Sequence, residues 1–424
     1  MQTIRAHTGP PAAPTSSTLS TARTAATAPT EATVPTEATV LTAATAPTAA
    51  TVPTAAGERM TPRERPEPAQ SKRALPVLGS TISARIEADR DARSGGGRVH
   101  ILTGAVCNNN CVFCMEEDRD GRYVTNSATT DDTVTQIVRA HRHAEEICFT
   151  SGEPTTNKRF PLWVKLAKDE GAKRISVMTN GRALGHEPYT KLLVAAGLRR
   201  VYVSIHGHTQ KLHESLTRTP QSFEQTVAGI RVTARFKPYG VELHTSTVVT
   251  KRNLPHMLEI YRFLRGLGVD QVIFNVMQAN GRADTHFEHI FPTYTEIART
   301  FAAMVLEARQ TEARPMAFLV DIPLCTTESV PDENRGYVEA YTHYEERGNG
   351  THDEKLRPRE GANEIGALVE VARDDLDEAL RTKRAECAGC KYDRVCEGVW
   401  VNYLKRYGWD EMVPIAHRQG PEQK

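Results

Sequence analysis

Three cysteines stand close together in the segment CNNNCVFC, which runs from residue 107 to residue 114. They are Cys107, Cys111 and Cys114, so the spacing is C-x3-C-x2-C. Common zinc sites favour paired C-x2-C knuckles and four ligands, which this spacing does not provide. A [4Fe–4S] cluster has four irons, and three thiolates leave one of them open. The segment therefore predicts an iron–sulfur cluster whose open iron could hold a substrate or cofactor, with zinc or a structural loop as the alternatives.

The charge and composition of the chain argue against several classes of protein. The 424 residues carry a formal net charge of +1, so no bulk attraction to nucleic acid or to an anionic membrane is expected. The sequence has no apolar run of 18 residues and no secretory signal at its N-terminus, which predicts a cytoplasmic protein without a membrane partner. Eight cysteines in clustered spacings favour metal ligation over a disulfide framework.

The first 74 residues have the composition of a disordered tail and linker. Residues 27–56 hold five near-identical hexads of Thr, Ala and Pro, a period too short for a solenoid repeat. Such residues offer little apolar surface to bury, which favours disorder over residues 1–74. A true start of translation further along, for example at Met60, is an open alternative. Residues 75–97 are interpreted as a lead-in segment.

From Arg98 onward, short apolar runs alternate with stretches of helical pattern. Alternating strands and helices imply a parallel sheet with right-handed crossovers. Six such units within about 200 residues predict an α/β fold, either a partial barrel or an open sheet. We expect this core over residues 98–321 and a small cysteine-rich extension over residues 322–424. The expected strands are 98–104, 146–150, 174–179, 200–205, 241–249 and 271–276.

An unusual motif follows each expected strand at its C-terminal end. In parallel α/β folds the site lies at that end of the sheet, so we expect these motifs to meet there. Any one motif is weak evidence, whereas six in register are much stronger. The motifs are the three cysteines, SGEP (151–154), TNG (179–181), SIHGH (204–208), TKRN (250–253) and NVMQANGR (275–282).

The segment CNNNCVFC, with Phe113 before its last cysteine, resembles the cysteine motif of the radical S-adenosylmethionine (radical SAM) superfamily. SGEP resembles the GGEP motif of the same family, and the resemblance covers residues 98 to about 321. It implies a partial (β/α)6, TIM-like barrel with parallel strands. It also implies that the open iron chelates the amino and carboxylate groups of S-adenosylmethionine (SAM). One electron from the cluster would then cleave SAM to methionine and a 5′-deoxyadenosyl radical, which abstracts hydrogen from a substrate.

The resemblance assigns site residues by position. It makes the three cysteines of the motif the catalytic cluster ligands, and it places Ser204 where the family contacts the ribose or carboxylate of SAM. Ser151 stands where the family usually has a glycine, and a small residue should still fit. Independently of the family, the carboxylate of Glu153 would favour a bound ammonium through a charge-assisted hydrogen bond. The positions expected to bind the cofactor are Phe113, Gly152, Glu153, Pro154, Asn180 and Ser204.

Several of these residues also have ordinary explanations. Glu153 could be a surface carboxylate, and Cys148, inside an expected strand, is best interpreted as a small buried hydrophobe. His206, His208 and His213 follow the fourth expected strand. They could position a substrate or could be ordinary loop histidines.

A second set of cysteines lies near the C-terminus, where Cys387, Cys390 and Cys396 have the spacing C-x2-C-x5-C. Cys325 is the natural fourth member. The set resembles the auxiliary-cluster extensions called SPASM and twitch domains, but Trp400 stands where a full SPASM pattern has a further cysteine. One auxiliary [4Fe–4S] cluster therefore fits and two do not. A zinc knuckle is the alternative, because ligation of zinc by four cysteines is ordinary.

The role of this second site depends on whether Cys325 is a ligand. Without it the auxiliary cluster would have an open iron that could bind substrate, whereas four ligands favour electron relay or tuning of the site. Between the two ends of the extension, residues 345–364 are expected to form an exposed loop and residues 367–383 an amphipathic helix.

Two further classes of function compete with a radical SAM enzyme. The first is an iron–sulfur electron-transfer protein, which would not need the amino-acid-binding pocket that SGEP implies. The second is a zinc-stabilised binding protein, which would be colourless rather than brown.

Within the enzyme class, the substrate could be a small biosynthetic metabolite or a ribosomal peptide. The stretch before Arg98 is short for a leader-binding domain, which favours the small molecule. By analogy with the family, the reductant would be a flavodoxin or a ferredoxin.

Overall fold

The computed structural model of the chain describes residues 98–104, 106–114, 130–142, 144–278, 281–330, 338, 352–356, 368–372, 381–393, 396 and 398–416. The chain divides into two units, Met1–Glu58 and Arg59–Lys424, and every described residue belongs to the second unit. The tail expected over residues 1–74 and the lead-in segment over residues 75–97 lie outside the described residues. No helix in the described ranges is long and apolar enough to cross a membrane.

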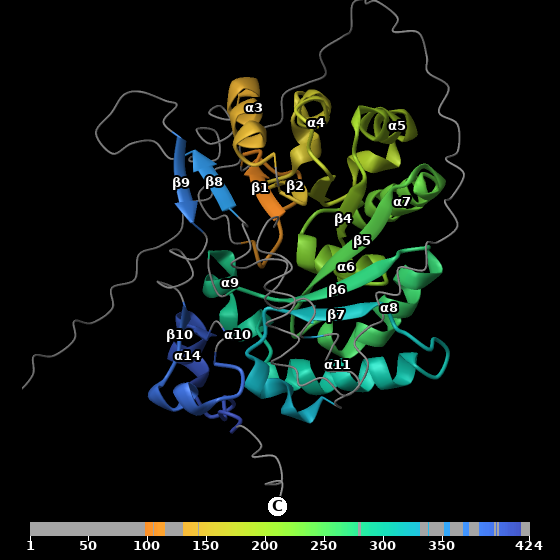
Figure 1. Cartoon of the computed structure of the whole chain (residues 1–424). Coiled ribbons are helices and arrows are strands. Elements are labelled where there is room, and N and C mark those ends of the chain that lie inside the picture. Colours follow the sequence, from red (N-terminus) through yellow and green to blue (C-terminus); the bar gives the residue numbers. More distant parts are fainter. Residues whose placement is uncertain are drawn as a thin grey trace, which may run out of the picture. The chain divides into compact units, whose positions relative to one another are not determined.

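Seven parallel strands, β1 to β7, form the central sheet, and each pairs with the strand before it in the chain (Figure 1). This sequential order with helical crossovers is that of a partial TIM-like barrel, so the expected α/β fold class is confirmed. The six expected strands agree with β1 to β6 to within two residues at their ends. The strands are β1 (Arg98–Leu102), β2 (Glu146–Thr150), β3 (Ile175–Thr179), β4 (Arg200–Ser204), β5 (Glu242–Val249), β6 (Gln271–Val276) and β7 (Ala317–Val320).

Two further strands extend the sheet beyond β1. Strand β8 (His352–Leu356) pairs parallel with β1, and β9 (Leu368–Ala372) pairs antiparallel with β8. The expected loop over residues 345–364 is therefore wrong where β8 lies, and the expected helix over 367–383 is wrong where β9 lies. The backbone groups at the edge of β1 provide a partner for a strand, and that long-range pairing overrides the local helical pattern.

The cysteine-rich extension contains a second, small sheet. Strand β10 (Arg381–Thr382) pairs antiparallel with β11 (Val399–Trp400), and helix α14 (Val401–Tyr407) follows directly. The last residues of the expected helix over 367–383 thus also form a strand. Cys325 lies in the 3-10 helix η5 (Leu324–Ser329). Cys387 lies in the 3-10 helix η6 (Ala385–Gly389), and Cys390 follows that helix directly.

Helices connect the parallel strands and cover one face of the sheet (Figure 1). Helix α11 begins with a capping box in which Thr293 and Glu296 each bond to the other's backbone. The helices are α3 (Asp131–Ala140), α4 (Phe160–Asp169), α5 (Glu187–Ala196), α6 (Gln210–Thr217), α7 (Ser222–Ala234), α8 (Met257–Gly266), α9 (Arg282–Thr285), α10 (Phe287–Ile290) and α11 (Tyr294–Ala308), with 3-10 turns η1 (Pro154–Thr156), η2 (Ala183–Gly185), η3 (Lys237–Tyr239) and η4 (Leu254–His256).

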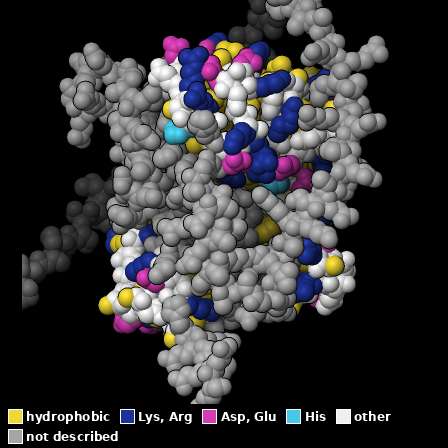
Figure 2. Space-filling model, in the orientation of Figure 1, with side chains coloured by type: hydrophobic (Ala, Val, Ile, Leu, Met, Phe, Trp, Pro, Cys, Tyr) yellow, Lys and Arg dark blue, Asp and Glu magenta, His cyan; other side chains and the backbone are white. Residues whose placement is uncertain are grey.

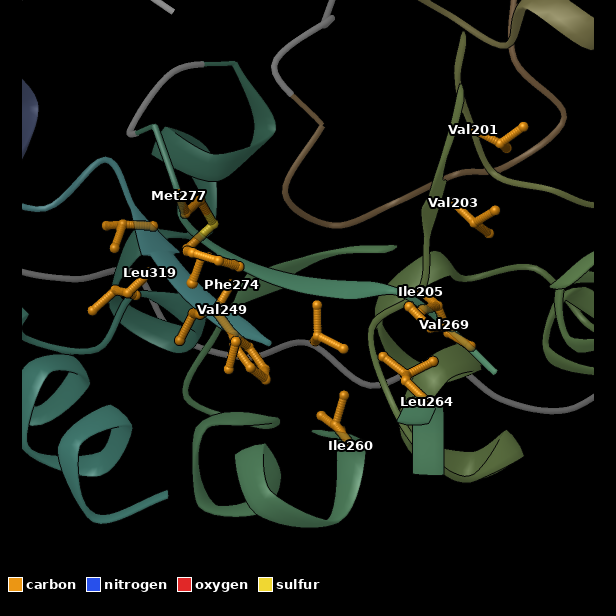
Figure 3. Packing of buried hydrophobic residues seen from close by; sticks show 14 of the residues in the cluster. Val201, Val203, Ile205, Val249, Ile260, Leu264, Val269, Phe274, Met277 and Leu319 are labelled. Carbon is orange, nitrogen blue, oxygen red and sulfur yellow. The ribbon is translucent and has the colours of Figure 1, made fainter. Parts of the chain in front are cut away.

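The main hydrophobic core lies between the sheet and these helices. Val201 and Val203 of β4, Phe274 of β6, and Ile260 and Leu264 of α8 belong to this core (Figure 3). Their alternation with residues of the opposite face follows from the two-residue period of a strand. On the surface drawn in Figure 2, described Lys and Arg side chains are interspersed with Asp and Glu in the upper part of the view, in keeping with the net charge of +1.

The inner face of the sheet carries a buried ion network at the N-terminal ends of the strands. Glu146, which is 3% exposed, accepts hydrogen bonds from Arg98 at 2.9 Å, Ser176 at 2.7 Å and Arg200 at 2.5 Å. Arg98 and Arg200 also lie over the ring of Tyr202. Burial alone would raise the pKa of Glu146, but Arg98, Arg200 and Ser176 outweigh it and hold the pKa below its ordinary value. This network closes the end of the sheet opposite the strand-end motifs.

Replacement of Glu146 by Gln should lower the free energy of unfolding by about 3–5 kcal/mol, because it leaves buried arginines without a counter-charge. The same carboxylate sets a pH dependence. Because its pKa is depressed in the folded state, its contribution is complete above the ordinary pKa and is lost as the pH falls through the folded pKa. Denaturant unfolding at pH 7 and in acid checks both points. A Glu146→Gln variant as stable and as acid-sensitive as the parent would contradict them.

Candidate active site

The C-terminal ends of the seven parallel strands meet at one edge of the sheet, and the six expected motifs follow β1 to β6 there. The structure adds a seventh, because Cys325 in the segment DIPLC follows β7. The site therefore lies at the end of the sheet where parallel α/β folds bind their ligands.

The loop of the first cysteine set is anchored to the end of helix α6. The backbone amide of Asn110 donates to the carbonyl of Thr217 at 3.0 Å, and that of Val112 donates to the carbonyl of Leu216 at 2.9 Å. Phe113 is buried and meets the ring of His206 edge-on, with 4.7 Å between ring centroids. The aromatic residue of the motif thus fastens the loop to the segment after β4.

The three sulfurs of this loop lie within electrostatic reach of one another. Burial raises the pKa of the Cys111 thiol, and the neighbouring Cys107 and Cys114 raise it further. Cys107 and Cys114 are half-buried. Within the ranges that the structure describes, no group of three or more His, Cys, Asp or Glu side chains is arranged around a single metal ion. A cubane cluster binds its cysteines on different irons, so its ligands need not converge on one point, and the donor set fits such a cluster.

Two arginines from other strand ends hold the cysteine loop. Arg182, after β3, donates to the carbonyl of Asn108 at 2.5 Å and to the side chain of Asn109 at 3.0 Å. Arg282, after β6, donates to the carbonyl of Cys111 at 3.1 Å and to the side chain of Asn110. The loop is thereby fixed from two sides by charge-assisted hydrogen bonds.

The backbone of the SGEP segment adopts an unusual conformation. Ser151 has a φ of +70° and Gly152 a φ of +55°, both in the left-handed region that favours glycine. A glycine at the position of Ser151 would adopt this φ without strain, which explains why the family pattern places glycine there. The turn brings the amide of Glu153 to the carbonyl of Val106 at 2.8 Å, directly beside the cysteine loop.

The carboxylate of Glu153 is buried, with 2% exposure, and its described partners are neutral. One oxygen accepts from the amide of Thr155 at 3.1 Å and from the hydroxyls of Thr155 and Thr179, each at 2.6 Å. The other accepts from the amide of Asn180 at 2.5 Å. Burial raises the pKa of Glu153, and these hydrogen bonds oppose the rise. The alternative of a surface carboxylate is therefore wrong.

Asn180 joins the carboxylate to the cysteine loop. Its amide donates to Glu153, and its side-chain nitrogen donates to the side chain of Asn108 at 2.6 Å. Close packing against helix α7 holds this turn. A Cβ on Gly229 would lie 2.0 Å from the carbonyl oxygen of Gly181, and Thr226 donates to the carbonyl of Asn180 at 2.9 Å.

Ser204 ends β4 on the inner face of the sheet, opposite Ser246 of β5. This face is partly exposed toward the strand ends, whereas the residues of the opposite face are buried. Asn275 of β6 donates to the hydroxyl of Ser246. The half-buried residues of this face toward the C-terminal strand ends are neutral, whereas the charged Arg200 and Glu242 lie at its N-terminal end. The neutral residues are Leu102, Thr150, Met178, Ser204, Ser246, Val248 and Asn275.

The histidines after β4 are part of the packing around the site. His206 is 3% exposed, its Nδ1 accepts from the amide of Val248 at 3.2 Å, and its ring stacks on that of His213. Burial, with His213 beside it, lowers the pKa of His206 well below its ordinary value, and burial lowers that of His213 to about 4. Both rings are thus neutral near pH 7. Burial also lowers the pKa of His208, whose ring lies 5.4 Å from that of His256. Cys148 is completely buried in β2, as expected.

The four cysteines of the second set come together. Burial raises the pKa of Cys325 to about 12, with further contributions from Cys396, Cys390 and Cys387. The amide of Gly398 donates to the sulfur of Cys396 at 3.4 Å. Cys325 therefore lies within electrostatic reach of the other three thiols, which agrees with its expected place as the fourth member of the set.

Comparison with known proteins agrees with the expected resemblance. Residues 101–264, which are less than half of the chain, match the model described as the Radical SAM superfamily. The superfamily uses a [4Fe–4S] cluster and SAM, which agrees with the expected SAM-binding cluster and with SAM as its ligand. The expected auxiliary cluster stays a prediction.

Curated relatives share the central part of the chain. It is 30% identical over 206 residues to the AdoMet-dependent heme synthase of Methanosarcina barkeri, covering 48% of this chain and 57% of that one. It is 27% identical over 169 residues to the probable GTP 3′,8-cyclase of Metallosphaera sedula, covering 39% and 51%. The chain thus spans only about half the length of these relatives.

Among solved structures, the fold is similar to that of Streptococcus suis SuiB. The TM-score is 0.52 both for SuiB bound to S-adenosylmethionine and for SuiB bound to its precursor peptide SuiA. The identities are 16% and 17%, and the alignments cover 77% of this chain and 79% and 77% of those chains. At this identity the likeness concerns the fold alone.

Sequence reasoning missed the positioning roles of several residues around the site. Arg182 follows the TNG segment by one residue, and its guanidinium spans from the side chain of Gln225 to the cysteine loop. Thr179 was placed in its motif but not as a donor to Glu153. Gly229 lies within helix α7, and nothing in the neighbouring sequence indicates its close approach to Gly181. Arg282 ends a motif, but its side-chain contacts are with residues of the cysteine loop far away in the sequence.

Replacement of Gly229 by Ala should displace the turn that carries Asn180, because the new methyl group would overlap the carbonyl of Gly181. We expect a loss of about 1–3 kcal/mol in the free energy of unfolding, and faster amide hydrogen exchange at residues 180–182. Gly266→Ala is the matched control, since Gly266 is an exposed helical glycine with no atom within 4 Å of its Cβ position. Equal effects of the two substitutions would disprove this role of Gly229.

Proposed function

We propose that the chain is a radical SAM enzyme in which Cys107, Cys111 and Cys114 hold a [4Fe–4S] cluster. The reaction is the reductive cleavage of SAM, followed by hydrogen abstraction from a substrate. The observation that carries this proposal is the connection between a buried carboxylate and the cysteine loop. The amide of Glu153 donates to the carbonyl of Val106, the residue before the cysteine loop. Asn180 links the carboxylate of Glu153 to the side chain of Asn108 within the loop.

The chemistry of the bound cluster is transfer of one electron, which breaks a carbon–sulfur bond of SAM and leaves methionine and a 5′-deoxyadenosyl radical. The residues of the chain provide binding, orientation and exclusion of water. We assign the cysteines to cluster binding and assign Phe113, Gly152, Pro154, Asn180 and Ser204, with Glu153, to the surroundings of SAM.

The environment of Glu153 supports a role in binding the ammonium group of SAM. A buried carboxylate with only neutral partners bears a desolvation cost, which its raised pKa reflects. An ammonium at hydrogen-bond distance would offset that cost and favour the ionised form. Asn180 donates to one carboxylate oxygen and so fixes the orientation in which the group would meet the ligand.

We propose a small metabolite as the substrate. The half-buried residues of the inner face at the C-terminal ends of the strands offer hydroxyl, amide and apolar groups but no charge. Two relatives bear names that specify haem synthesis and cyclisation of GTP, which are reactions of small molecules. SuiB, in contrast, was solved with a precursor peptide. A peptide substrate is therefore the competing outcome, and a flavodoxin or ferredoxin remains the proposed reductant in a cytoplasmic setting.

For the second cysteine set, we propose one auxiliary [4Fe–4S] cluster bound by Cys325, Cys387, Cys390 and Cys396. The support is the proximity of Cys325 to the other three thiols. Four protein ligands leave no iron open, which favours electron relay or tuning over substrate binding. Zinc in this site would give a colourless extension, so metal analysis of the isolated protein distinguishes the two.

The first test is anaerobic formation of 5′-deoxyadenosine from SAM and dithionite by protein reconstituted with iron and sulfide. We expect product from the parent protein and only background from Cys111→Ala, because that variant loses one of three ligands of the cluster. Cys148→Ala is the matched control, since Cys148 lies in β2 outside both cysteine sets. Undiminished product from Cys111→Ala would rule out the assigned ligands, and none from a fully loaded parent protein would favour the electron-transfer protein.

A second test is the affinity for SAM of a Glu153→Gln variant. We expect a loss of about 10- to 100-fold, the range of a charge-assisted hydrogen bond. Equilibrium dialysis with labelled SAM, on samples of equal iron content and equal melting temperature, measures this affinity. Glu145→Gln is the control, because Glu145 is an exposed partner of Lys173. Unchanged affinity in Glu153→Gln would remove Glu153 from the SAM site.

A further inference from the structure

Helix α9 (Arg282–Thr285) contacts the first cysteine loop directly. The amide of Arg282 donates to the carbonyl of Cys114 at 3.0 Å, and its guanidinium donates to the carbonyl of Cys111 at 3.1 Å. The guanidinium also donates to the side chain of Asn110. The carbonyl of Cys111 also accepts from the amide of Cys114 at 3.4 Å, so Arg282 reinforces a turn of the loop and adds a donor from outside it for the carbonyl of Cys114.

The same helix contacts the cysteine-rich extension on its other side. Arg406 of α14 forms an ion pair with Asp284, with 2.9 Å between nitrogen and oxygen. Its guanidinium also lies over the ring of Phe287, 4.6 Å from the centroid. Arg406 is held by its own helix through the carbonyl of Asn402 at 3.0 Å. Tyr407 adds a hydrogen bond to the carbonyl of Phe291 at 3.0 Å. Helix α14 is thus fixed against the segment that begins with Arg282.

Helix α14 is in turn tied to the second cysteine set. It follows β11 without a break, and β11 pairs with β10, where Arg381 lies opposite Trp400. Arg381 forms an ion pair with Asp321 at 2.6 Å, four residues before Cys325. Its guanidinium also lies 3.9 Å from the ring centroid of Trp400. The strand that ends at Trp400 therefore joins the surroundings of the second cysteines to the contacts with α9.

We propose that α9 is a positioning element that couples the two cysteine sets, with Arg282 acting on the first loop and the Asp284–Arg406 pair acting on the extension. A group bound by the second set would order α14, which holds α9 and so favours the conformation of the loop from Cys107 to Cys114 in which Arg282 contacts it. By linkage, a group bound in the loop stabilises the extension to the same degree. The identity of the bound groups rests on the proposed function, whereas the coupling concerns contacts within the chain.

The first experiment uses the full chain without iron and follows amide hydrogen exchange of the loop peptide by mass spectrometry. We expect exchange about tenfold faster in Arg282→Ala and about threefold faster in Arg406→Ala, because each change lowers the free energy of local opening. Arg282→Lys should recover only part of the protection, since the ammonium of lysine is more strongly hydrated than a guanidinium and gains less from the two acceptors. Arg231→Ala, an exposed change on α7, is the control and should exchange like the parent.

A merely structural role would raise exchange across the whole barrel and lower the melting temperature, whereas a positioning role confines the change to the loop. Loop exchange at the parent rate in both Arg282→Ala and Arg406→Ala would overturn the coupling. Because no iron is present, this result does not depend on whether the protein cleaves SAM.

The second experiment tests transmission in a variant whose first set cannot bind a group, Cys107→Ala with Cys111→Ala and Cys114→Ala. Ferrous iron and sulfide are added, and loop exchange is compared before and after the second set is loaded. We expect slower loop exchange on loading, and no slowing when Arg406→Ala is added. Slowing that persists with Arg406→Ala, or loading without slowing, would overturn the proposal. A failure of the second set to take up iron is visible in the absorption spectrum and contradicts the proposed auxiliary cluster; zinc then replaces iron as the probe of the same coupling.

Discussion

Parallel pairing of neighbouring strands is the constraint on which the site depends. Since β1 to β7 run in one direction and each pairs with its predecessor, every segment that follows a strand emerges at the same edge of the sheet. Residues separated by more than two hundred positions, such as Cys111 and Cys325, are brought to one end of the fold without any local signal linking them. Backbone hydrogen bonds between the parallel strands bring these residues together, and the side chains at the edge of the sheet then determine the chemistry.

Two buried carboxylates among the described residues of the barrel show that burial alone does not define the role of a side chain. Glu146, at the N-terminal ends of the strands, is matched by Arg98 and Arg200, and its pKa is lowered. Glu153, at the opposite end, is matched by hydroxyls and amides, and its pKa is raised. The first charge is already compensated within the protein and serves the stability of the sheet. The second has the surroundings of a group whose cationic partner comes from outside the chain.

The site is held in place by residues that are not themselves assigned to the cluster or to SAM. Arg182 and Arg282 bond to backbone carbonyls and amide side chains of the cysteine loop, and Gly229 allows helix α7 to approach the turn of Asn180. Such residues fix the geometry of the ligands, because a loop of turns and bends leaves carbonyls that need donors from elsewhere. The connection of α9 to α14 extends the same principle to the cysteine-rich extension.

Local patterns predicted those parts of the protein that depend on local physics. Strands β1 to β6 are short runs rich in apolar and β-branched residues, buried at most positions in the sheet, so their residue types indicated them. Strand β7 was missed because AFLV is four residues long and follows a polar turn, too short a run to separate from a helix or loop. The hairpin of β8 and β9 was misjudged because its stability comes from pairing with β1, which no window of the sequence contains.

The sequence by itself determined the chemistry that the chain can offer, since the spacing of Cys107, Cys111 and Cys114 and the SGEP segment are properties of consecutive residues. It also predicted the first six strands and their parallel direction, through the alternation of apolar runs and helical patterns, but left open whether they form a partial barrel or an open sheet. Only the tertiary structure decided which residues support the site. The guanidinium of Arg282 reaches the cysteine loop, and Cys325 reaches the other three cysteines of its set, through contacts between strand ends far apart in the chain. Those contacts arise from packing and hydrogen bonding between elements, which residue spacing along a chain does not encode.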